Sequence, residues 1–409
     1  MPSLHLPDLP PLLRLALLAG LAGLLPLAWW GWRQRGASAS ARLAALTALT
    51  LFLTFDLIVF GAFTRLSDSG LGCPDWPGCY GQASPLGASQ HILAAQSALP
   101  SGPVTLAKAW IEMIHRYLAM VVGLLILLAA GLSWRARAVL PHSPAWAAAT
   151  LAWVVVQGLF GKYTVTLKLY PAIVTLHLLG AMGLLALLVL QHESVRNRAL
   201  VWRGGRRVGW RQSTFVAAVL AVLLLQIALG GWVSTNYAVL ACTGFPACNG
   251  QWWPAMDVGA GFTLLRELGQ SGQGGYLAFE ALVAIHMAHR LFALAALAAL
   301  LVLAWALWRA PGRSQRRYAL ALLSLVLWQA GSGLSNVVLG WPIFAALAHS
   351  AGAAGLVALL SSLWARLRAG ERALAAMAGC LAVSAGRTGH DSPARTLADH
   401  GPRAAQTSP

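Results

Sequence analysis

The chain has 409 residues, of which 58% are hydrophobic and only 10% are charged. Soluble domains carry about 25% charged residues, so this composition excludes an ordinary soluble domain and predicts a polytopic membrane protein. The net charge of +17 does not predict nucleic-acid binding, because the basic residues are spread over alternate loops instead of one compact face.

Nine apolar stretches are long enough to cross a bilayer core of about 30 Å as helices. They are predicted at residues 12–32, 43–64, 109–132, 146–166, 172–192, 213–236, 282–308, 318–338 and 342–365. The basic loops between them fall on one side, which the positive-inside rule makes cytoplasmic. The N-terminus and the loops after the second and sixth spans then lie outside, and the C-terminus lies in the cytoplasm.

The first span could be a cleaved signal sequence or a retained helix. Its basic cluster follows the apolar stretch, and no small-residue cleavage site stands out after it, so we predict a retained helix. Beyond residue 366 the chain is rich in Arg, Ala, Ser and Gly, which predicts a flexible cytoplasmic tail.

Two cysteine motifs reveal an internal repeat. GLGCPDWPGCYGQ (70–82) and ACTGFPACNGQ (241–251) share two cysteines, an aromatic-Pro pair between them and a Gly-Gln after them. Three further segments align at offsets between 169 and 174 residues: EMIHRYLAM (112–120) with HMAHRLFAL (286–294), QGLFG (157–161) with QAGSG (329–333), and TLHLLGAMGLL (175–185) with LAHSAGAAGLV (347–357). The chain is therefore a duplication.

The repeated unit contains four helices, and an even number brings both copies into the membrane with the same orientation. The predicted fold is an all-α polytopic membrane protein of two parallel-repeat four-helix bundles plus one extra N-terminal transmembrane helix. The predicted divisions are the extra helix and its loop (1–42), the N-terminal half (43–195), a basic linker (196–212), the C-terminal half (213–366) and the tail (367–409).

Four of the eleven histidines recur at matched positions, His115 with His289 and His177 with His349. Ionisable groups at membrane depth are costly and usually functional, and each lies about 10 Å below the outer surface at 1.5 Å per residue. Two opposed imidazoles without thiolates or carboxylates suit haem iron better than zinc, which takes more protein ligands. The absence of CxxCH from the sequence excludes a c-type haem.

Small and basic residues accompany these histidines. Glycines at eight positions would leave room for a flat macrocycle, although close helix packing is the alternative explanation. They are Gly158, Gly161, Gly180, Gly183, Gly331, Gly333, Gly352 and Gly355. Arg116 and Arg290, each directly after a histidine, are candidates for contacts with haem propionates, or extend to the interface.

The two halves differ at one informative position. Glu112 lies three residues before His115, on the same helical face, whereas His286 holds the equivalent place before His289. A carboxylate beside a haem-sized pocket can accept a proton or stabilise a developing cation. This difference predicts chemistry in the N-terminal half and an electron-handling site in the C-terminal half.

Taken together, FGAFTRLSDSGLGCPDWPGC, EMIHR, TLHLLGAMGLL, GGWVSTN, AHR and LAHS resemble the haem A synthase family over residues 43–365. The resemblance implies a bacterial inner-membrane oxidoreductase that converts the C8 methyl group of haem O to the formyl group of haem A, by successive hydroxylation and dehydration, for cytochrome oxidase. It implies haem O as substrate, haem b as cofactor, and a haem O synthase and oxidase assembly factors as functional neighbours. A homo-oligomer is compatible with it.

The same resemblance implies roles for five residues. Glu112 matches the catalytic glutamate of the family, and His115 and His177 match the pair around the substrate haem. His289 and His349 match the iron ligands of haem b. The extra N-terminal helix departs from the minimal pattern of the family and leaves these assignments intact.

Cys73 and Cys79 match the outer-loop redox pair of the family, while Cys242 and Cys248 form a second pair that not all members have. Each pair could be a structural disulfide, or could control access or electron flow at a haem site. Two other functions stay open: a di-haem b electron carrier or haem transporter, which leaves Glu112 unexplained, and a membrane thiol-disulfide oxidoreductase, which leaves the histidines unexplained.

Overall fold

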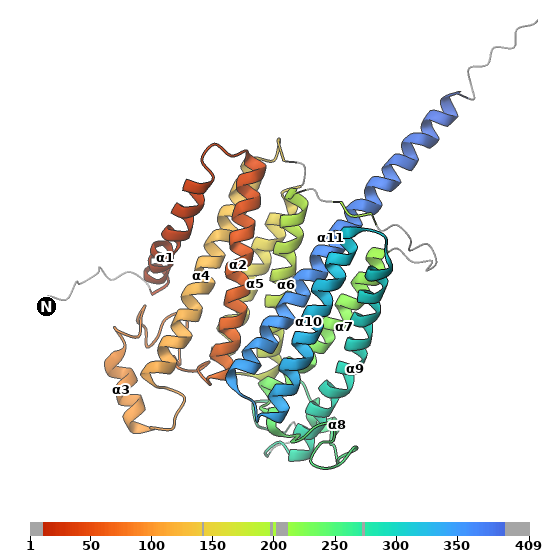
Figure 1. Cartoon of the computed structure of the whole chain (residues 1–409). Helices are drawn as coiled ribbons and strands as arrows, with labels where there is room; N and C mark the ends of the chain where they lie inside the picture. The colour runs from red at the N-terminus through yellow and green to blue at the C-terminus, as the bar shows by residue number, and fades with distance from the viewer. Residues whose placement is uncertain (1–10, 141–142, 197–198, 202–211, 272–274, 389–409) are drawn as a thin grey trace, which may run out of the picture.

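The computed structural model describes residues 11–140, 143–196, 199–201, 212–271 and 275–388, and over these residues the protein is helical (Figure 1). The long helices are α1 (Pro11–Arg33), α2 (Ala39–Leu66), α4 (Leu106–Arg135), α5 (Ala145–Thr166), α6 (Pro171–Arg196), α7 (Gln212–Thr235), α9 (Phe279–Arg309), α10 (Arg313–Val338) and α11 (Ile343–Thr388). Three short helices lie in the connections: α3 (Ser89–Ala98), η1 (Ala238–Leu240) and α8 (Val258–Gly261).

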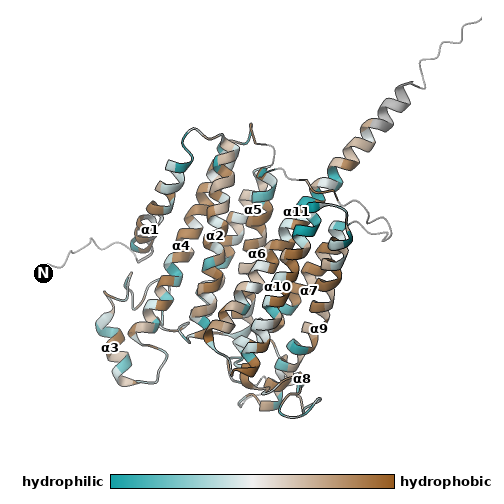
Figure 2. Ribbon diagram, viewed as in Figure 1, coloured by the Kyte–Doolittle hydropathy of each residue, from teal (hydrophilic) through white to brown (hydrophobic). Residues whose placement is uncertain are grey.

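The predicted class, an all-α polytopic membrane protein, is confirmed. Eight of the described helices are long and apolar enough to cross a membrane, and Figure 2 shows hydrophobic residues along the bundle with hydrophilic ones mainly in the connecting segments. The predicted count of nine spans is not confirmed, because α5 falls outside this set. Its polar residues, Gln157 and Lys162 among them, lower its hydropathy, although α5 packs between α4 and α6.

Each half forms a ring of four packed helices. Helices α2, α4, α5 and α6 contact one another in cyclic order, and α7, α9, α10 and α11 do the same. Both cysteine loops lie at one end of the bundle, the end near α3 and α8 in Figure 1. We call this the cysteine-loop end; the shared orientation is the one that a repeat of four helices requires.

The halves meet along α2 and α6 on one side and α7 and α11 on the other. The centre of this contact is apolar and includes Met182 and Leu185 of α6, Leu223 of α7, and Leu356 and Leu360 of α11, all buried. Since lipid tails are as apolar as leucine, close packing and polar contacts must hold the two bundles together.

Polar contacts join the halves at the cysteine-loop end. Arg65 Nη2 donates to the Ser234 carbonyl at 2.6 Å, and its guanidinium lies 4.0 Å from the centre of the Tyr237 ring. Tyr237 Oη donates to Asp68 Oδ1 at 2.7 Å. Both hydrogen bonds join residues 169 positions apart, the offset of the cysteine motifs, so equivalent positions of the two copies meet as they do on a two-fold axis.

A charged contact joins the halves at the opposite end. Glu193 of α6 accepts hydrogen bonds from Arg366 Nε and Nη2, each at 2.9 Å. Ser362 Oγ donates to the same carboxylate at 2.7 Å. A bidentate pair of this kind fixes orientation as well as distance, so it sets the register between α6 and α11.

The extra helix α1 packs against α4 of the N-terminal half, and Trp30 Nε1 of α1 donates to the Arg42 carbonyl of α2 at 3.1 Å. A Cβ at Gly23 would lie 3.3 Å from Leu124 Cδ2, so the two helices approach closely there. Leu15 of α1 is buried in one cluster with Cys73, Cys79 and Met113. The helix therefore supports the first cysteine loop, and the C-terminal half has no counterpart in the described residues.

Helix α11 continues to Thr388, past residue 366 where we expected the C-terminal half to end. The predicted tail is thus helical in its first part, and residues 389–409 lie outside the described residues. The predicted basic linker, 196–212, also lies mostly outside them, since residues 202–211 are not described. The domain boundaries stay a prediction.

Candidate functional site: two histidine pairs beneath the cysteine loops

In the N-terminal half, His115 lies on α4 and His177 on α6, the two helices that are diagonal to each other in the ring. Each imidazole packs against a glycine of a neighbouring helix. A Cβ at Gly61 of α2 would lie 2.9 Å from His115 Cε1, and one at Gly161 of α5 would lie 3.6 Å from His177 Cε1. Each of the four helices of the ring therefore contributes either a histidine or a glycine that faces one.

The C-terminal half repeats this arrangement. His289 lies on α9 and His349 on α11, the diagonal pair of helices in that ring. A Cβ at Gly230 of α7 would lie 2.9 Å from His289 Cε1, and one at Gly333 of α10 would lie 3.1 Å from His349 Cε1. The glycines keep the neighbouring helix surfaces clear of the rings, because almost any other side chain would displace the imidazole.

Haem fits this donor set better than a bare metal ion does. Among the described residues no group of three or more His, Cys, Asp or Glu side chains could hold a metal ion. A porphyrin supplies four nitrogen ligands itself and needs only two axial imidazoles from the protein. In the N-terminal half the buried Nδ1 atoms of His115 and His177 have no hydrogen-bond partner among the described residues.

The carboxylate of Glu112 lies directly beneath the first cysteine loop. Glu112 is only 4% exposed, and its Oε2 accepts a hydrogen bond from the Cys73 amide at 2.8 Å. Its Oε1 accepts a short hydrogen bond from Arg116 Nη2. The buried charge is thus paired and hydrogen-bonded, which is the condition for keeping a carboxylate in an apolar environment.

Arg116 holds the same loop from below. Its Nη1 donates to the carbonyls of Asp75 at 2.9 Å, Pro77 at 3.2 Å and Gly78 at 2.6 Å. These carbonyls and Glu112 are its described partners, and a contact with a haem propionate stays a prediction. In this structure Arg116 connects the carboxylate to the disulfide loop.

In the second cysteine loop, Arg290 occupies the equivalent position. Its Nη2 donates to the Cys242 carbonyl at 3.0 Å and its Nη1 to the Ala247 carbonyl at 3.4 Å. The residue one turn before it on α9 is His286, so the buried carboxylate of the first half is absent here. The loop is attached in the same way, but without the acidic group.

Both cysteine pairs form disulfides. The Cα atoms of Cys73 and Cys79 are 4.9 Å apart, and those of Cys242 and Cys248 are 4.7 Å apart. All four residues are at most 2% exposed. The same turn follows each pair, because Cys79 and Gln82 exchange two backbone hydrogen bonds, as do Cys248 and Gln251.

The first loop lies very close to α4. A Cβ at Gly72 would lie 2.6 Å from the backbone nitrogen of Ala109, so only glycine permits this approach. Trp76-Pro77 and Phe245-Pro246, the aromatic-Pro steps of the two motifs, are both cis peptides. The sequence pattern shared by the motifs is therefore a shared backbone conformation.

Asp68 provides the main charged group at the edge of the first loop. It accepts hydrogen bonds from Tyr237 Oη and, at 3.2 Å, from Lys108 Nζ. Burial raises the pKa of Asp68, but the hydrogen bonds from Tyr237 and Lys108 outweigh burial and hold the pKa below its usual 3.8. The carboxylate is ionised at neutral pH and links the loop to the other half.

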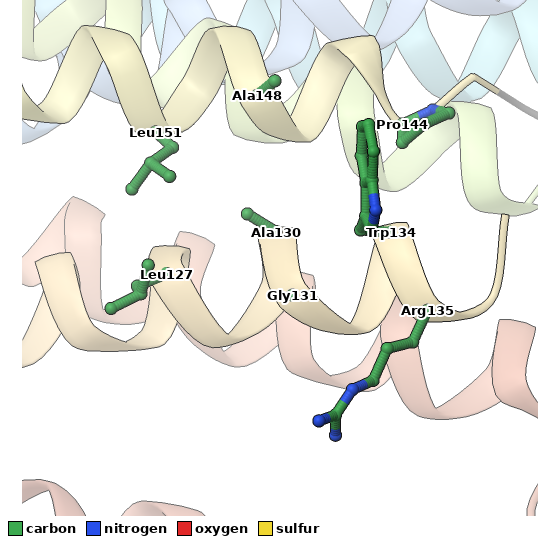
Figure 3. Close-up of a pocket in the computed structure, with 8 residues that line it drawn as sticks. All are labelled: Leu127, Ala130, Gly131, Trp134, Arg135, Pro144, Ala148 and Leu151. Carbon is green, nitrogen blue, oxygen red and sulfur yellow. The ribbon is translucent and has the colours of Figure 1, made fainter.

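A cavity of about 410 Å³ lies between α4 and α5 (Figure 3). It is lined by Leu127, Trp134 and Leu151 among others, and the guanidinium of Arg135 points away from α5. Leu127 lies about 18 Å along α4 from His115, at 1.5 Å per residue. This cavity is therefore separate from the candidate site.

Comparison with known proteins identifies the family of the chain. Residues 44–361 match the model of the family described as cytochrome oxidase assembly protein. The chain belongs to this family. A relative from Shewanella oneidensis named heme A synthase is 38% identical over 320 residues, which cover 78% of this chain and 94% of the relative.

Two other relatives named heme A synthase are less similar in sequence. The relative from a Caulobacter species is 29% identical over 353 residues, covering 78% of this chain and 96% of the relative. The one from Shouchella clausii is 29% identical over 215 residues, covering 52% of this chain and 65% of the relative. The matched residues of the family include both histidine pairs and both cysteine loops.

Two hydrogen-bonding residues beside the histidines were not among the sequence candidates. Gln226 of α7 contacts His289, and Ser332 of α10 contacts His349. A signal for them exists in the repeat, because Leu57 and Phe160 occupy the equivalent positions of the N-terminal half. A polar residue that replaces an apolar one in only one copy marks a contact specific to that copy.

Proposed function

We propose that this protein is a haem A synthase, which oxidises the C8 methyl group of haem O to a formyl group by two hydroxylations followed by loss of water. Membership of the cytochrome oxidase assembly family and relatives named heme A synthase support the proposal. The observation that carries it is the buried Glu112, three residues before His115 on α4, whose place before His289 in the other half is taken by His286. A simple carrier of two haems needs no such difference.

In this proposal His289 and His349 hold a haem b, and His115 and His177 hold the substrate haem O. The opposed imidazoles and the glycines Gly61 and Gly230 that face them support both assignments. Iron porphyrin supplies the redox chemistry, because amino-acid side chains do not oxidise an unactivated methyl group.

Glu112 would act on the substrate through its own charge and basicity. Arg116 and the Cys73 amide hold the carboxylate in place, and each oxygen keeps a second lone pair. That lone pair can accept a proton from a water molecule or from the methyl substituent, and the negative charge can stabilise positive charge that develops on the methyl carbon. The first cysteine loop would close the site above it.

The proposal includes the orientation in the bacterial inner membrane. Arg33, Arg135, Arg196 and Arg309 lie in the last turns of α1, α4, α6 and α9. These ends lie opposite the cysteine loops, which supports a cytoplasmic location for the basic end and the C-terminus. The disulfides would then lie in the oxidising periplasm.

The test is to express the chain with a source of haem O in cells that lack haem A, and then to extract and identify the haems. We expect the mass and red-shifted spectrum of haem A. If only haem O is found while the protein is inserted and carries haem, the protein is a haem carrier. If the protein binds no haem, the proposed sites are wrong.

A further inference from the structure

The histidines of the C-terminal half have hydrogen-bond partners for their second ring nitrogen. Ser332 Oγ lies 3.1 Å from His349 Nδ1 and donates its own proton to the Trp328 carbonyl at 2.8 Å. Its lone pairs are therefore free to accept from a protonated Nδ1. This fixes the tautomer in which Nε2 of His349 has no proton, which is the tautomer that binds a metal.

Gln226 plays the same part for the other histidine. Its amide nitrogen lies 3.0 Å from His289 Nδ1 and 3.2 Å from the His289 carbonyl, and its Oε1 has no partner among the described residues. As drawn, Gln226 Nε2 donates to the His289 carbonyl. Rotation of the amide by 180° gives up that bond and places Oε1 at the position 3.0 Å from Nδ1, where it accepts from a protonated Nδ1. Nε2 of His349 has one neighbouring amide, Gln329 Nε2 at 3.5 Å, the limit of a hydrogen bond.

The N-terminal half lacks an equivalent of either hydrogen-bond partner, Gln226 or Ser332. Gly61 aligns with Gly230 and Gly161 with Gly333, which sets the register and places Leu57 opposite Gln226 and Phe160 opposite Ser332. Leu57 and Phe160 offer no hydrogen-bonding group. In accord with this, Nδ1 of both His115 and His177 is buried without a partner among the described residues.

This difference has a direct consequence for metal binding. A hydrogen bond at the second ring nitrogen fixes the tautomer and orientation of a histidine ligand and raises its basicity, and its loss lowers metal affinity by about 10–100-fold. We propose that Gln226 and Ser332 are positioning residues that make the C-terminal pair a permanent haem site, and that Leu57 and Phe160 make the N-terminal pair an exchange site. The inference rests on the proposed function, in which a substrate enters and a product leaves one site while the cofactor stays in the other.

The experiment measures haem transfer from the purified full-length chain, loaded with haem b, to apomyoglobin as the acceptor. We expect a fast phase from the N-terminal site, which His177→Ala removes, and a slow phase from the C-terminal site. Gln226→Leu and Ser332→Ala should each accelerate the slow phase by about 10-fold. The reverse exchanges, Leu57→Gln and Phe160→Ser, should slow the fast phase by a similar factor.

Gln226→Glu separates a positioning role from a structural one. A carboxylate accepts more strongly from Nδ1, so the slow phase should stay slow and the reduction potential of that haem should fall. Gln226→Leu should raise the same potential, and a residue that only supports packing would not reverse the sign. The ferric electron paramagnetic resonance spectrum should shift in both variants.

The inference is overturned if Gln226→Leu and Ser332→Ala release haem at the wild-type rate with unchanged potential. It is also overturned if the wild-type chain shows a single phase from two occupied sites. Haem A production by a wild-type chain with these results would leave the proposed function standing. A wild-type chain that binds no haem at all would remove the proposed function first.

Discussion

The two halves of this protein share one arrangement of helices and histidines, but different residues surround the histidines. Each brings two imidazoles against facing glycines below a disulfide loop held by an arginine. Within the described residues, the buried carboxylate below the first loop, Glu112, has His286 in its place in the second half, and Nδ1 has a hydrogen-bond partner in the second histidine pair, Gln226 and Ser332, but not in the first. The two copies therefore share one arrangement of histidines and differ in the groups that surround it.

The largest expected effect comes from removing the acidic group. Glu112→Gln should lower haem A formation by about 10²–10⁴-fold, the usual contribution of an acid or base catalyst, and should leave haem b bound. His286→Gln is the matched change in the other half and should have little effect on haem A. Haem extraction and chromatography measure both outcomes, and normal haem A from Glu112→Gln would remove this residue from the mechanism.

Loss of the first disulfide should lower haem A formation more than loss of the second. Cys73→Ser with Cys79→Ser should lower haem A formation by about 10-fold, because Glu112 is bonded to the Cys73 amide and displacement of a catalytic group by 1 Å costs up to about 100-fold. The pair Cys242→Ser with Cys248→Ser should cost less, since no carboxylate depends on that loop. Equal losses from both double variants would contradict the assignment of the reaction to the N-terminal half.

Substitution of the glycines that face the histidines tests whether the hydrogen bond between Gln226 and His289 affects haem binding. A Cβ at Gly61 or Gly230 would meet the imidazole at the same 2.9 Å, and overpacking costs about 1–3 kcal/mol. The hydrogen bond to Gln226 restricts movement of the His289 ring away from the added methyl group. Gly230→Ala should therefore lower the haem content of the purified protein more than Gly61→Ala does. Gly161→Ala is the control, because its Cβ would lie at an ordinary 3.6 Å from His177.

The smallest expected effect concerns the contact between halves. Because the pKa of Asp68 is lower in the folded protein than its usual 3.8, its contribution to stability is complete above about pH 4 and is lost as the pH falls through the folded pKa. Asp68→Asn should abolish that acid dependence at a cost of at most about 1 kcal/mol, since the pair with Lys108 is partly exposed. Thermal unfolding in detergent between pH 3 and pH 7 measures it, and an unchanged acid profile in Asp68→Asn would contradict the assignment.

Much of the fold follows from the sequence because membrane helices obey simple rules. Apolar length predicts spans, and the observed helices begin and end within a few residues of the predictions at most boundaries. The count of nine spans stays unconfirmed and α11 is longer than predicted, and both results have physical causes. Polar residues such as Gln157 make α5 a marginal span, and the Ala-rich segment after residue 366 favours helix, so α11 extends to Thr388.

The histidine pairs could also be predicted, since a duplicated chain exposes its functional positions by repetition. The hydrogen-bond partners of Arg116 could not be predicted. They are three backbone carbonyls of the loop, and every residue type carries the same carbonyl group. The contacts between halves were equally hidden: Glu193 and Arg366 are 173 positions apart, and only packing of α6 against α11 brings them together.

The sequence by itself determined the duplication, the helical class and the four histidines, because each depends on local apolar length or on residue identity repeated at a constant offset. The tertiary structure decided what surrounds those histidines. It placed Glu112 against the Cys73 amide, Gln226 and Ser332 against two imidazoles, and no partner against the other two within the described part of the chain. Hydrogen bonds depend on distances of a few tenths of an ångström between separate helices, and that information exists only once the helices are packed.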